Sequence, residues 1–307
     1  ETRHHGCLPK INVWELSSTK MMTDGSYPLE DITVIDCSSV YAGPMAAQVL
    51  GDLGAEVIKI EHPEFGDGVR SHGQHDDALA FKWLNRNKKS VGVDLHEPEG
   101  QAIVEELVKD ADVFIENFRP GTLERWNVGW EDLSEINPEL VMVRVTGFGQ
   151  NGPYSDRPGF GTLAEAMSGF AHVTGQEDGP PTLPSLGLAD FICGIFSAYS
   201  AMVALYWRDV NDGEGQYIDM SLLEPLFSFM GVHAVDYTQK GIIHERQGNR
   251  THSSSPRNTY RTADDRWVAM AGATEGTAQR IMRIVGGEDV LEDPRFATMA
   301  ARIEHDD

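Results

Sequence analysis

Three loops combine glycine, amide and cationic side chains in a way that suits a phosphate-bearing ligand. The stretch Asn85–Ser90 places three cations in six residues of a very acidic chain, and such a patch can receive phosphates. A solvated turn before a strand explains it equally well. In Glu116–Gly121, Asn117 and Arg119 could hydrogen-bond an adenine or a phosphate. The loop Thr146–Pro153 is dense in glycine, so its backbone could approach a ligand and offer N–H donors to a developing oxyanion.

A fourth loop, Val40–Pro44, follows the first expected strand, at the edge where open α/β sheets bind ligands. It does not read GxGxxG, so a nicotinamide-binding fingerprint is unsupported. Taken alone, it is more simply a tight turn between a strand and a helix. Each of the four motifs is ambiguous by itself. Together, in this order at successive strand ends, they point much more strongly to a ligand site.

The elements that must position these loops alternate between strand and helix. Short β-branched runs predict parallel strands at Ile32–Asp36, Glu56–Glu61, Ser90–Leu95, Val113–Asn117, Leu140–Val145 and Gln216–Met220. Helices are expected at Met45–Leu53, at Glu97–Asp110 and around Leu123–Trp126. This alternation predicts an α/β fold with a Rossmann-like, doubly wound parallel sheet. The apolar stretch Ala189–Trp207 is predicted as a buried helix, because Gly and Ser interrupt it and charges flank it too closely for a membrane span.

The composition and periodicity of the sequence also divide the chain into parts. Residues 1–27 show no sustained period and are predicted to be an extension outside the fold. Residues 28–226 form the predicted large domain. Beyond them the sequence loosens until Arg266–Met270, which is typical of a strand in a second, smaller α+β domain over residues 227–307.

The composition argues against several classes of function. The net charge of -23 comes from 48 acidic and 25 basic residues, so nucleic acid is not an expected partner. The balance of 8 Lys against 17 Arg suits a halophilic protein, with a merely acidic mesophilic enzyme as the alternative. Cys7, Cys37 and Cys193 are widely spaced and form no CxxC pair, which predicts reduced thiols and no metal site. Without a signal peptide or membrane span, we expect a cytoplasmic protein with no membrane partner.

The ordered motifs resemble those of the class III CoA-transferases, a family that includes formyl-CoA and carnitine CoA-transferases and the alpha-methylacyl-CoA racemases. The motifs that carry the likeness are Val40–Pro44, Glu56–Glu61, Asn85–Ser90, Glu116–Gly121, Thr146–Gln150, Ala166–Gly169 and Gly215–Gln216. The resemblance implies a Rossmann-like, CoA-binding large domain, a smaller second domain and an interlocked homodimer. It also implies an enzyme that moves coenzyme A between an acyl-CoA thioester and a free carboxylic acid, without a metal.

The resemblance also indicates which residues contact CoA. It places the nucleotide and pantetheine near Val40, Tyr41, Ala42, Val93, Asn117, Phe118 and Arg125. His62 and His96 stand where relatives carry basic residues, which weakens the expected grip on phosphate. Lys88, Lys89 and Arg119 could compensate.

The catalytic residue is the main departure. The resemblance places the aspartate nucleophile of the transferases at Gly161, directly after Phe160. Glu165, about one helical turn onward, is the first candidate to replace it and Asp190 the second. Each has a structural alternative: Glu165 as a solvated or paired helix carboxylate, Asp190 as a helix N-cap. The racemases carry His and Asp at the positions of Phe160 and Asp190, and only the aspartate is kept here.

Two alternative functions therefore stay open, an acyl-CoA racemase or epimerase and a catalytically inactive CoA-binding subunit. The likeness further predicts a small domain that stops before its C-terminal segment, so that the chain is a fragment. The acid-binding pocket is expected to include Gly147–Gly152 and His252–Asn258. Nothing in those loops dictates which acyl group is bound.

Overall fold

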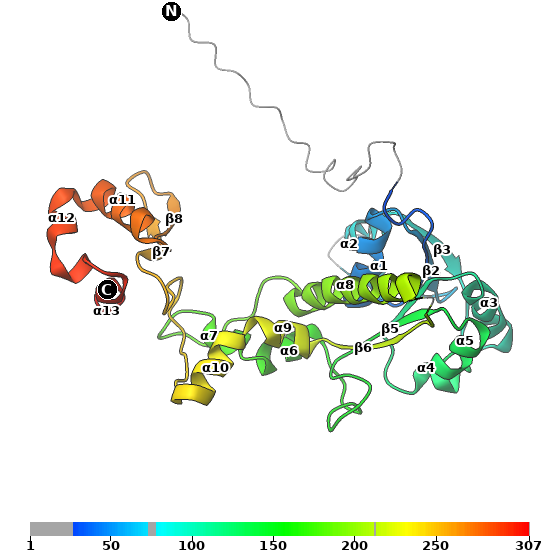
Figure 1. Ribbon diagram of the computed structural model, residues 1–307. Coiled ribbons are helices and arrows are strands. Elements are labelled where there is room, and N and C mark those ends of the chain that lie inside the picture. The colour runs from blue at the N-terminus through cyan, green and yellow to red at the C-terminus, as the bar shows by residue number, and fades with distance from the viewer. Residues whose placement is uncertain (1–26, 73–77, 212, 307) are drawn as a thin grey trace, which may run out of the picture. The chain divides into compact units, whose positions relative to one another are not determined.

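The computed structural model describes residues 27–72, 78–211 and 213–306. The described chain folds as two compact units, each with its own helices and strands (Figure 1). The large unit takes the chain as far as Ser168 and again over Ser185–Phe229, and the small unit takes Gly169–Pro184 and the residues from Met230 onward. The chain therefore enters the small unit twice, whereas the sequence indicated a single boundary at residue 226. The predicted extension over residues 1–27 lies, apart from Tyr27, outside the described residues.

The large unit is built on a sheet of six parallel strands in the order β3-β2-β1-β4-β5-β6. The strands are β1 (Thr33–Cys37), β2 (Glu56–Glu61), β3 (Lys88–Gly92), β4 (Val113–Glu116), β5 (Val141–Thr146) and β6 (Tyr217–Ser221). The predicted α/β fold with a doubly wound parallel sheet is confirmed. The chain direction across the sheet reverses between β1 and β4, and the loops that follow these two strands diverge there to leave a crevice for a ligand.

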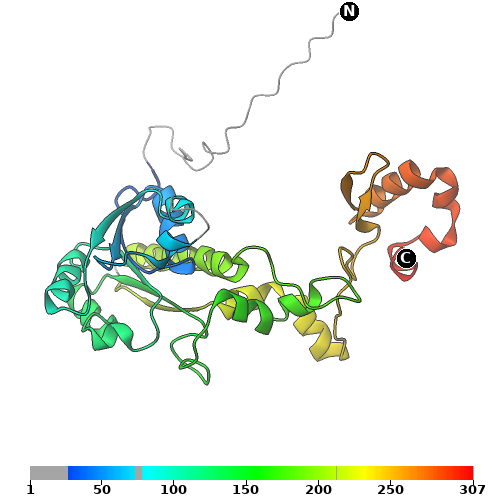
Figure 2. The same ribbon diagram turned by 180° about the vertical axis from the view of Figure 1, so that it is seen from behind.

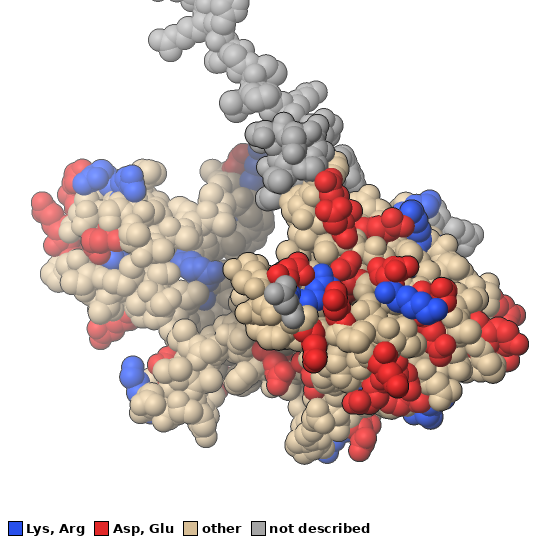
Figure 3. Space-filling model, turned by 45° about the vertical axis from the view of Figure 1, so that its right-hand side comes forward, with Lys and Arg blue, Asp and Glu red and all other residues tan. Residues whose placement is uncertain are grey.

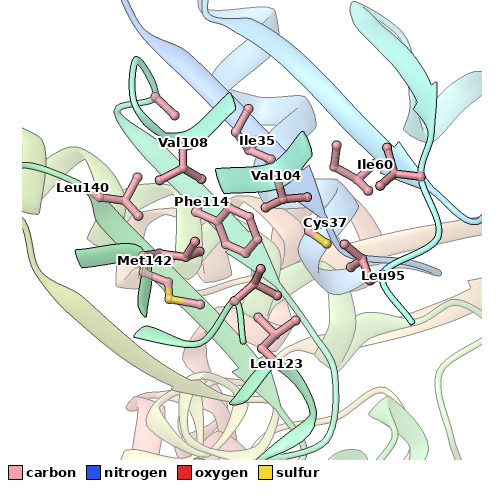
Figure 4. Packing of buried hydrophobic residues seen from close by; sticks show 14 residues of the cluster. Ile35, Cys37, Ile60, Leu95, Val104, Val108, Phe114, Leu123, Leu140 and Met142 are labelled. Atoms are coloured by element: carbon pink, nitrogen blue, oxygen red, sulfur yellow. The ribbon is translucent and has the colours of Figure 1, made fainter. Parts of the chain in front are cut away.

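Helices cover both faces of this sheet (Figures 1 and 2). The helices of the large unit are α1 (Ala42–Asp52), α2 (Leu79–Leu84), α3 (Pro98–Val108), α4 (Thr122–Arg125), α5 (Trp130–Ile136), α6 (Gly161–Met167), α8 (Leu188–Asn211) and α9 (Leu223–Phe229). On the face covered by α3, α4 and α5, Phe114 of β4 packs among Val104, Val108 and Met142 (Figure 4). All four are fully buried, and full burial of such a side chain contributes about 1.5–3 kcal/mol.

Helix α8 lies on the opposite face, together with α1. Its Gly194 lets the two helices approach closely, because a Cβ at this position would lie 2.7 Å from Cβ of Met45 and 2.8 Å from the carbonyl oxygen of Ala42. Within the described residues, α8 alone has the length and apolar composition of a membrane span. One face of α8 is buried in the large unit, with small residues such as Ala198 and Ala201. Tyr199 and Tyr206 on its other face are exposed, so the prediction of a buried helix holds for one face only.

The small unit combines a hairpin with short helices. Strands β7 (Arg257–Arg261) and β8 (Trp267–Ala271) pair in antiparallel fashion, and the helices are α7 (Phe170–Val173), α10 (Gly231–Lys240), α11 (Glu275–Gly286), α12 (Glu288–Glu292) and α13 (Met299–Glu304). Arg302 ties α13 to α11 and to the segment before β7. Its guanidinium is buried, donates to the carbonyl oxygen of Ser255 at 3.0 Å and pairs with Glu275 at 2.7 Å.

The acidic composition is visible on the surface of the large unit. On the face shown in Figure 3, Asp and Glu side chains cover more of this unit than Lys and Arg do. Acidic side chains at this density repel one another, and concentrated salt screens that repulsion.

Candidate functional site

A cavity of about 320 Å³ opens at the carboxyl ends of the strands, at the switch point between β1 and β4. The loops after β1, β4 and β5 supply most of its wall, and the first turn of α8 supplies Asp190. The lining residues are Ser39, Val40, Tyr41, Ala42, Asn117, Phe118, Arg119, Pro120, Val145, Thr146, Gly147, Ser155, Arg157, Pro158, Gly159, Phe160, Asp190 and Leu222. This is the position at which doubly wound sheets bind ligands.

A smaller cavity of about 160 Å³ lies at the carboxyl ends of β1, β2 and β3. It shares Ser39 and Phe118 with the larger one. Its other lining residues are Cys37, Ser38, Ile60, Glu61, His62, Gly66, Asp67, Val93, Leu95, His96 and Trp126. The two cavities together bring six of the predicted CoA contacts to one edge of the sheet, namely Val40, Tyr41, Ala42, Val93, Asn117 and Phe118.

The loops after β1 and β4 are fastened to each other through Asn117. Its Oδ1 accepts a hydrogen bond from Ser39 N at 2.8 Å, and its Nδ2 donates to the Ser39 carbonyl oxygen at 2.7 Å. The ring of Tyr41 meets the ring of Phe191 edge-on, with centroids 5.7 Å apart. Because Phe191 follows Asp190 directly, this contact joins the β1 loop to the segment that carries the carboxylate.

Two carboxyl groups lie together at the start of α8. Glu165 is 3% exposed, and its Oε1 accepts a hydrogen bond from Ala189 N at 3.2 Å. Asp190 is half-buried and lines the large cavity. Burial, and then the charge of Glu165, raise the pKa of Asp190 to about 6. Asp190 is therefore still ionised at neutral pH, and of the two it is the carboxylate that a ligand in the cavity can touch.

Gly161 has a steric reason to be glycine. A Cβ built on it would lie 2.1 Å from Oδ2 of Asp190, closer than any real contact. A side chain at position 161 would therefore displace the Asp190 carboxylate from its present place. Phe160, which precedes Gly161, is exposed at 69% and lines the same cavity.

The comparisons with known proteins show the family of the chain. Residues 29–307 match the model of CoA-transferase family III. The chain belongs to CoA-transferase family III. A succinyl-CoA–D-citramalate CoA-transferase of Chloroflexus aurantiacus is 43% identical over 281 residues, which cover 91% of this chain and 70% of that protein. A succinate–glutarate CoA-transferase of Agrobacterium fabrum is 38% identical over 287 residues, which cover 91% and 71%.

A solved structure places the fold in the same family. The crystal structure of a CAIB/BAIF family protein from Brucella suis superposes with a TM-score of 0.80 at 34% identity, covering 91% of this chain and 75% of that one. The resemblance to class III CoA-transferases predicted from the sequence is confirmed, and so is the prediction of a transferase enzyme that acts on CoA thioesters.

The two lysines predicted to grip CoA phosphates lie elsewhere in this family III chain. Lys88 and Lys89 are the first residues of β3, and neither lines either cavity. The ammonium group of Lys88 is buried and donates at 2.8–2.9 Å to Asp36, to Asn85 and to the carbonyl oxygen of Pro44, which uses all three of its protons. Lys89 is exposed and pairs with Glu56. The prediction for both is corrected, because the protons of the Lys88 ammonium group are already used inside the protein and Lys89 lies beside Glu56 at the start of the strands.

Arg125 also lies outside both cavities, where its Nη2 donates to Oγ1 of Thr122 at 2.9 Å. Of the loops expected to bind the acid, Gly147 lines the large cavity, packed against Gly159 with no room for a Cβ on either residue. The stretch His252–Asn258 belongs to the small unit.

Within the described residues, His62, Asp94 and His96 form the one group whose ligand atoms lie close enough together to hold a metal ion. Their own hydrogen bonds explain the arrangement. Nδ1 of His96 lies 2.8 Å from Asp94, and Nδ1 of His62 is close to the backbone N–H groups of Glu64 and Phe65. Nε2 of His62 faces Asp94 at 3.7 Å. We assign no metal to this group.

Sequence reasoning missed Arg157, which lines the large cavity in the loop between β5 and α6. Its guanidinium lies over the ring of Tyr154, 4.0 Å from the centroid. Among the described residues, Arg119 and Arg157 are the two arginines whose guanidinium groups neither pair with a carboxylate nor donate a hydrogen bond. Both line the cavity that contains Asp190. The only available signal was the scarcity of cations in so acidic a chain.

Proposed function

We propose that this chain moves CoA between a dicarboxylic acyl-CoA and a free dicarboxylic acid, with Asp190 as the covalent nucleophile. One observation carries the proposal: a single cavity is lined by Asp190 and by two exposed arginines, Arg119 and Arg157, whose guanidinium groups have no carboxylate partner among the described residues. Nearly all the other arginines that the structure describes pair with a carboxylate or donate to a carbonyl oxygen. The chain has almost twice as many acidic as basic residues. Two unpaired cations beside a nucleophile suit a substrate that brings its own second carboxylate.

The reaction needs only the exchange of acyl bonds. The Asp190 carboxylate attacks the thioester carbonyl and the C–S bond breaks. CoA leaves as a thiolate, and the acyl group stays on Asp190 as a mixed anhydride. The thiolate attacks the Asp190 acyl carbon, expels the donor acid as a carboxylate and forms an Asp190–CoA thioester. The acceptor carboxylate attacks that thioester, and the returning thiolate takes the acceptor acyl group and frees Asp190. No proton is gained or lost overall.

The arrangement favours Asp190 over Glu165 for this role. Glu165 is buried outside the cavity wall and is committed to Ala189 N, so it can act on the substrate only through Asp190. Ala42, in the first turn of α1, lines the cavity, and the amino end of a helix favours the negative charge that develops on the carbonyl oxygen.

The names of the relatives support a dicarboxylic substrate. The two compared above are named for succinyl-CoA with D-citramalate and for succinate with glutarate. A further relative from Chloroflexus aurantiacus, 39% identical, is named as the beta subunit of a succinyl-CoA–L-malate CoA-transferase. All of these acids carry a second carboxylate, which a guanidinium in the cavity can bind.

The test is incubation of the chain, in high salt, with succinyl-CoA and a panel of free acids, with mass analysis of products and protein. Transfer of CoA to a dicarboxylic acid, with a protein adduct of one CoA less one water, is the expected result. Solvent deuterium appearing at the α-carbon without transfer would instead favour a racemase, and binding of CoA without any product would favour an inactive subunit.

Replacement of Glu165 by Gln is expected to move the acid limb of the rate profile to lower pH. Asp190 must be ionised to attack, so the rate falls as the pH drops through its pKa of about 6, which burial and then the charge of Glu165 raise. A neutral Gln can still accept the hydrogen bond from Ala189 N but no longer repels the Asp190 charge.

The measurement is kcat between about pH 4.5 and 8, where the variant should keep a larger share of its maximal rate near pH 5. Glu135→Gln, an exposed carboxylate on α5, is the matched control and should leave the profile in place. An unchanged acid limb in Glu165→Gln would mean that Glu165 does not set the titration of Asp190.

A further inference from the structure

The β1 loop holds a valine in a conformation that valine avoids. Val40 has a φ of 71°, in the left-handed region, where a β-branched residue is a true outlier. Val40 is partly buried and lines the cavity, as do Tyr41 and Ala42, which follow it directly. A backbone held in such a state persists only where its surroundings fix it.

The group that fixes Val40 is Asp67. Oδ1 of Asp67 accepts a hydrogen bond from Val40 N at 3.0 Å and another from Val69 N at 2.9 Å. Asp67 is 3% exposed, so its carboxylate is largely shielded from water, which strengthens both bonds. The aspartate belongs to the segment after β2, and it reaches across to the loop after β1.

Asp67 is itself held by a buried lysine. Nζ of Lys59 lies 2.9 Å from Oδ2 of Asp67, donates to the Ser38 carbonyl oxygen at 2.8 Å and lies 3.6 Å from Asp36. Burial opposes the charge of Lys59, but Asp36 and Asp67 outweigh it and raise its pKa, so the ammonium group is kept. Lys59 thus fixes the carbonyl side of the loop while Asp67 fixes the N–H side of Val40.

We propose that Asp67, held by Lys59, is a positioning residue for CoA transfer: it acts through the backbone N–H of Val40 to keep the β1 loop in the shape that forms the cavity wall. This rests on the proposed function. Released, Val40 relaxes to a negative φ and swings Tyr41 away from Phe191, the neighbour of Asp190. The predicted effect falls on how the CoA thioester is held, and so on KM more than on kcat.

The alternative is that Asp67 is merely structural, because its bond to Val69 N also caps the short 3₁₀ helix Gly68–Ser71. A double-mutant cycle separates the two roles. Glycine adopts a positive φ without penalty, so Val40→Gly removes the need for a restraint but leaves the cap untouched.

In the parent background, Asp67→Ala should lower kcat/KM for succinyl-CoA by about tenfold. Without Asp67, nothing offsets the cost of the left-handed conformation at Val40, which is of that size for one residue. In the Val40→Gly background the same change should cost less than about threefold. An equal loss in both backgrounds would overturn the proposal. Asp67→Asn, which keeps an acceptor for Val40 N, should lose much less than Asp67→Ala. If Asp67→Ala does not fold, Lys59→Met, which removes the group that holds the Asp67 carboxylate, replaces it in the cycle.

A crystal structure of Asp67→Ala gives a reading that needs no activity. A negative φ at Val40 is expected, and an unchanged positive φ would contradict the proposal. A parent chain that binds CoA thioester but does not transfer CoA would count against the proposed function alone. The role of Asp67 would still be tested by the φ of Val40 in the crystal structure and by the affinity for the thioester.

Discussion

Asp190→Asn is expected to abolish CoA transfer, lowering kcat by roughly 10⁴-fold or more, as when a covalent nucleophile is removed. The amide keeps the size of the carboxylate and fits beside Gly161, so the cavity and the affinity for the CoA thioester should survive. The measurement combines the transfer rate with intact protein mass. The CoA adduct should be present in the parent chain treated with succinyl-CoA and absent from the variant.

Asp190→Glu is the matched control, because it keeps the charge but pushes the carboxylate further into the cavity. It should recover part of the adduct and little of the rate, since misplacement of a reacting group by about 1 Å can cost roughly 10²-fold. An adduct that persists in Asp190→Asn and disappears in Glu165→Gln would move the nucleophile to Glu165 and overturn the assignment.

The sheet could be predicted because each strand is a β-branched run with a clear end. The predicted strands over Glu56–Glu61 and Val113–Asn117 agree with β2 and β4 to within one residue. The fold class and the family followed from the order of these runs and of the loops between them. Their local signal is strong because strands buried on both faces must be apolar along most of their length.

The error at Lys88 and Lys89 has a physical cause at the start of β3. That strand begins at Lys88, whereas the sequence suggested Ser90, because two lysines in succession are typical of a solvated loop. Lys88 can enter a strand because the carboxylate of Asp36 balances its charge in the interior. Asp36 lies on β1, which is separated from β3 by β2. A compensating charge so far away along the chain leaves no mark in a local pattern.

The proposed catalytic carboxylate, Asp190, could be predicted only as one of two candidates. Gly161 and Asp190 come together through the packing of α6 beside α8, and no local spacing relates them. From the sequence alone, a glycine at position 161 suggests a missing nucleophile. In the structure, the absence of a side chain at Gly161 leaves room for the Asp190 carboxylate. The restraint on Val40 was equally hidden, because a positive φ at a valine is set by Asp67 and Lys59 and not by its own preference.

Arg157→Ala is expected to lower kcat/KM for a dicarboxylic acceptor by about 10- to 100-fold, from the loss of a charged hydrogen bond to its second carboxylate. Arg157 is favoured over Arg119 for this contact. Tyr154 orients its guanidinium, and its loop leads directly into Phe160 and Gly161, next to the nucleophile. The measurement compares glutarate with pentanoate, which has the same chain length but a single carboxylate. Activity with pentanoate should change little, so that the preference for the diacid collapses.

Arg119→Ala provides the contrast, because Arg119 follows Asn117 and Phe118 on the side of the cavity expected to hold CoA. Its loss should raise KM for the CoA thioester to the same extent with either acid and leave the preference intact. Arg266→Ala removes an exposed arginine of the small unit and controls for net charge. Equal losses with glutarate and pentanoate in Arg157→Ala would show that this guanidinium does not read the second carboxylate, and the same equality in both cavity variants would remove the argument for a dicarboxylic substrate.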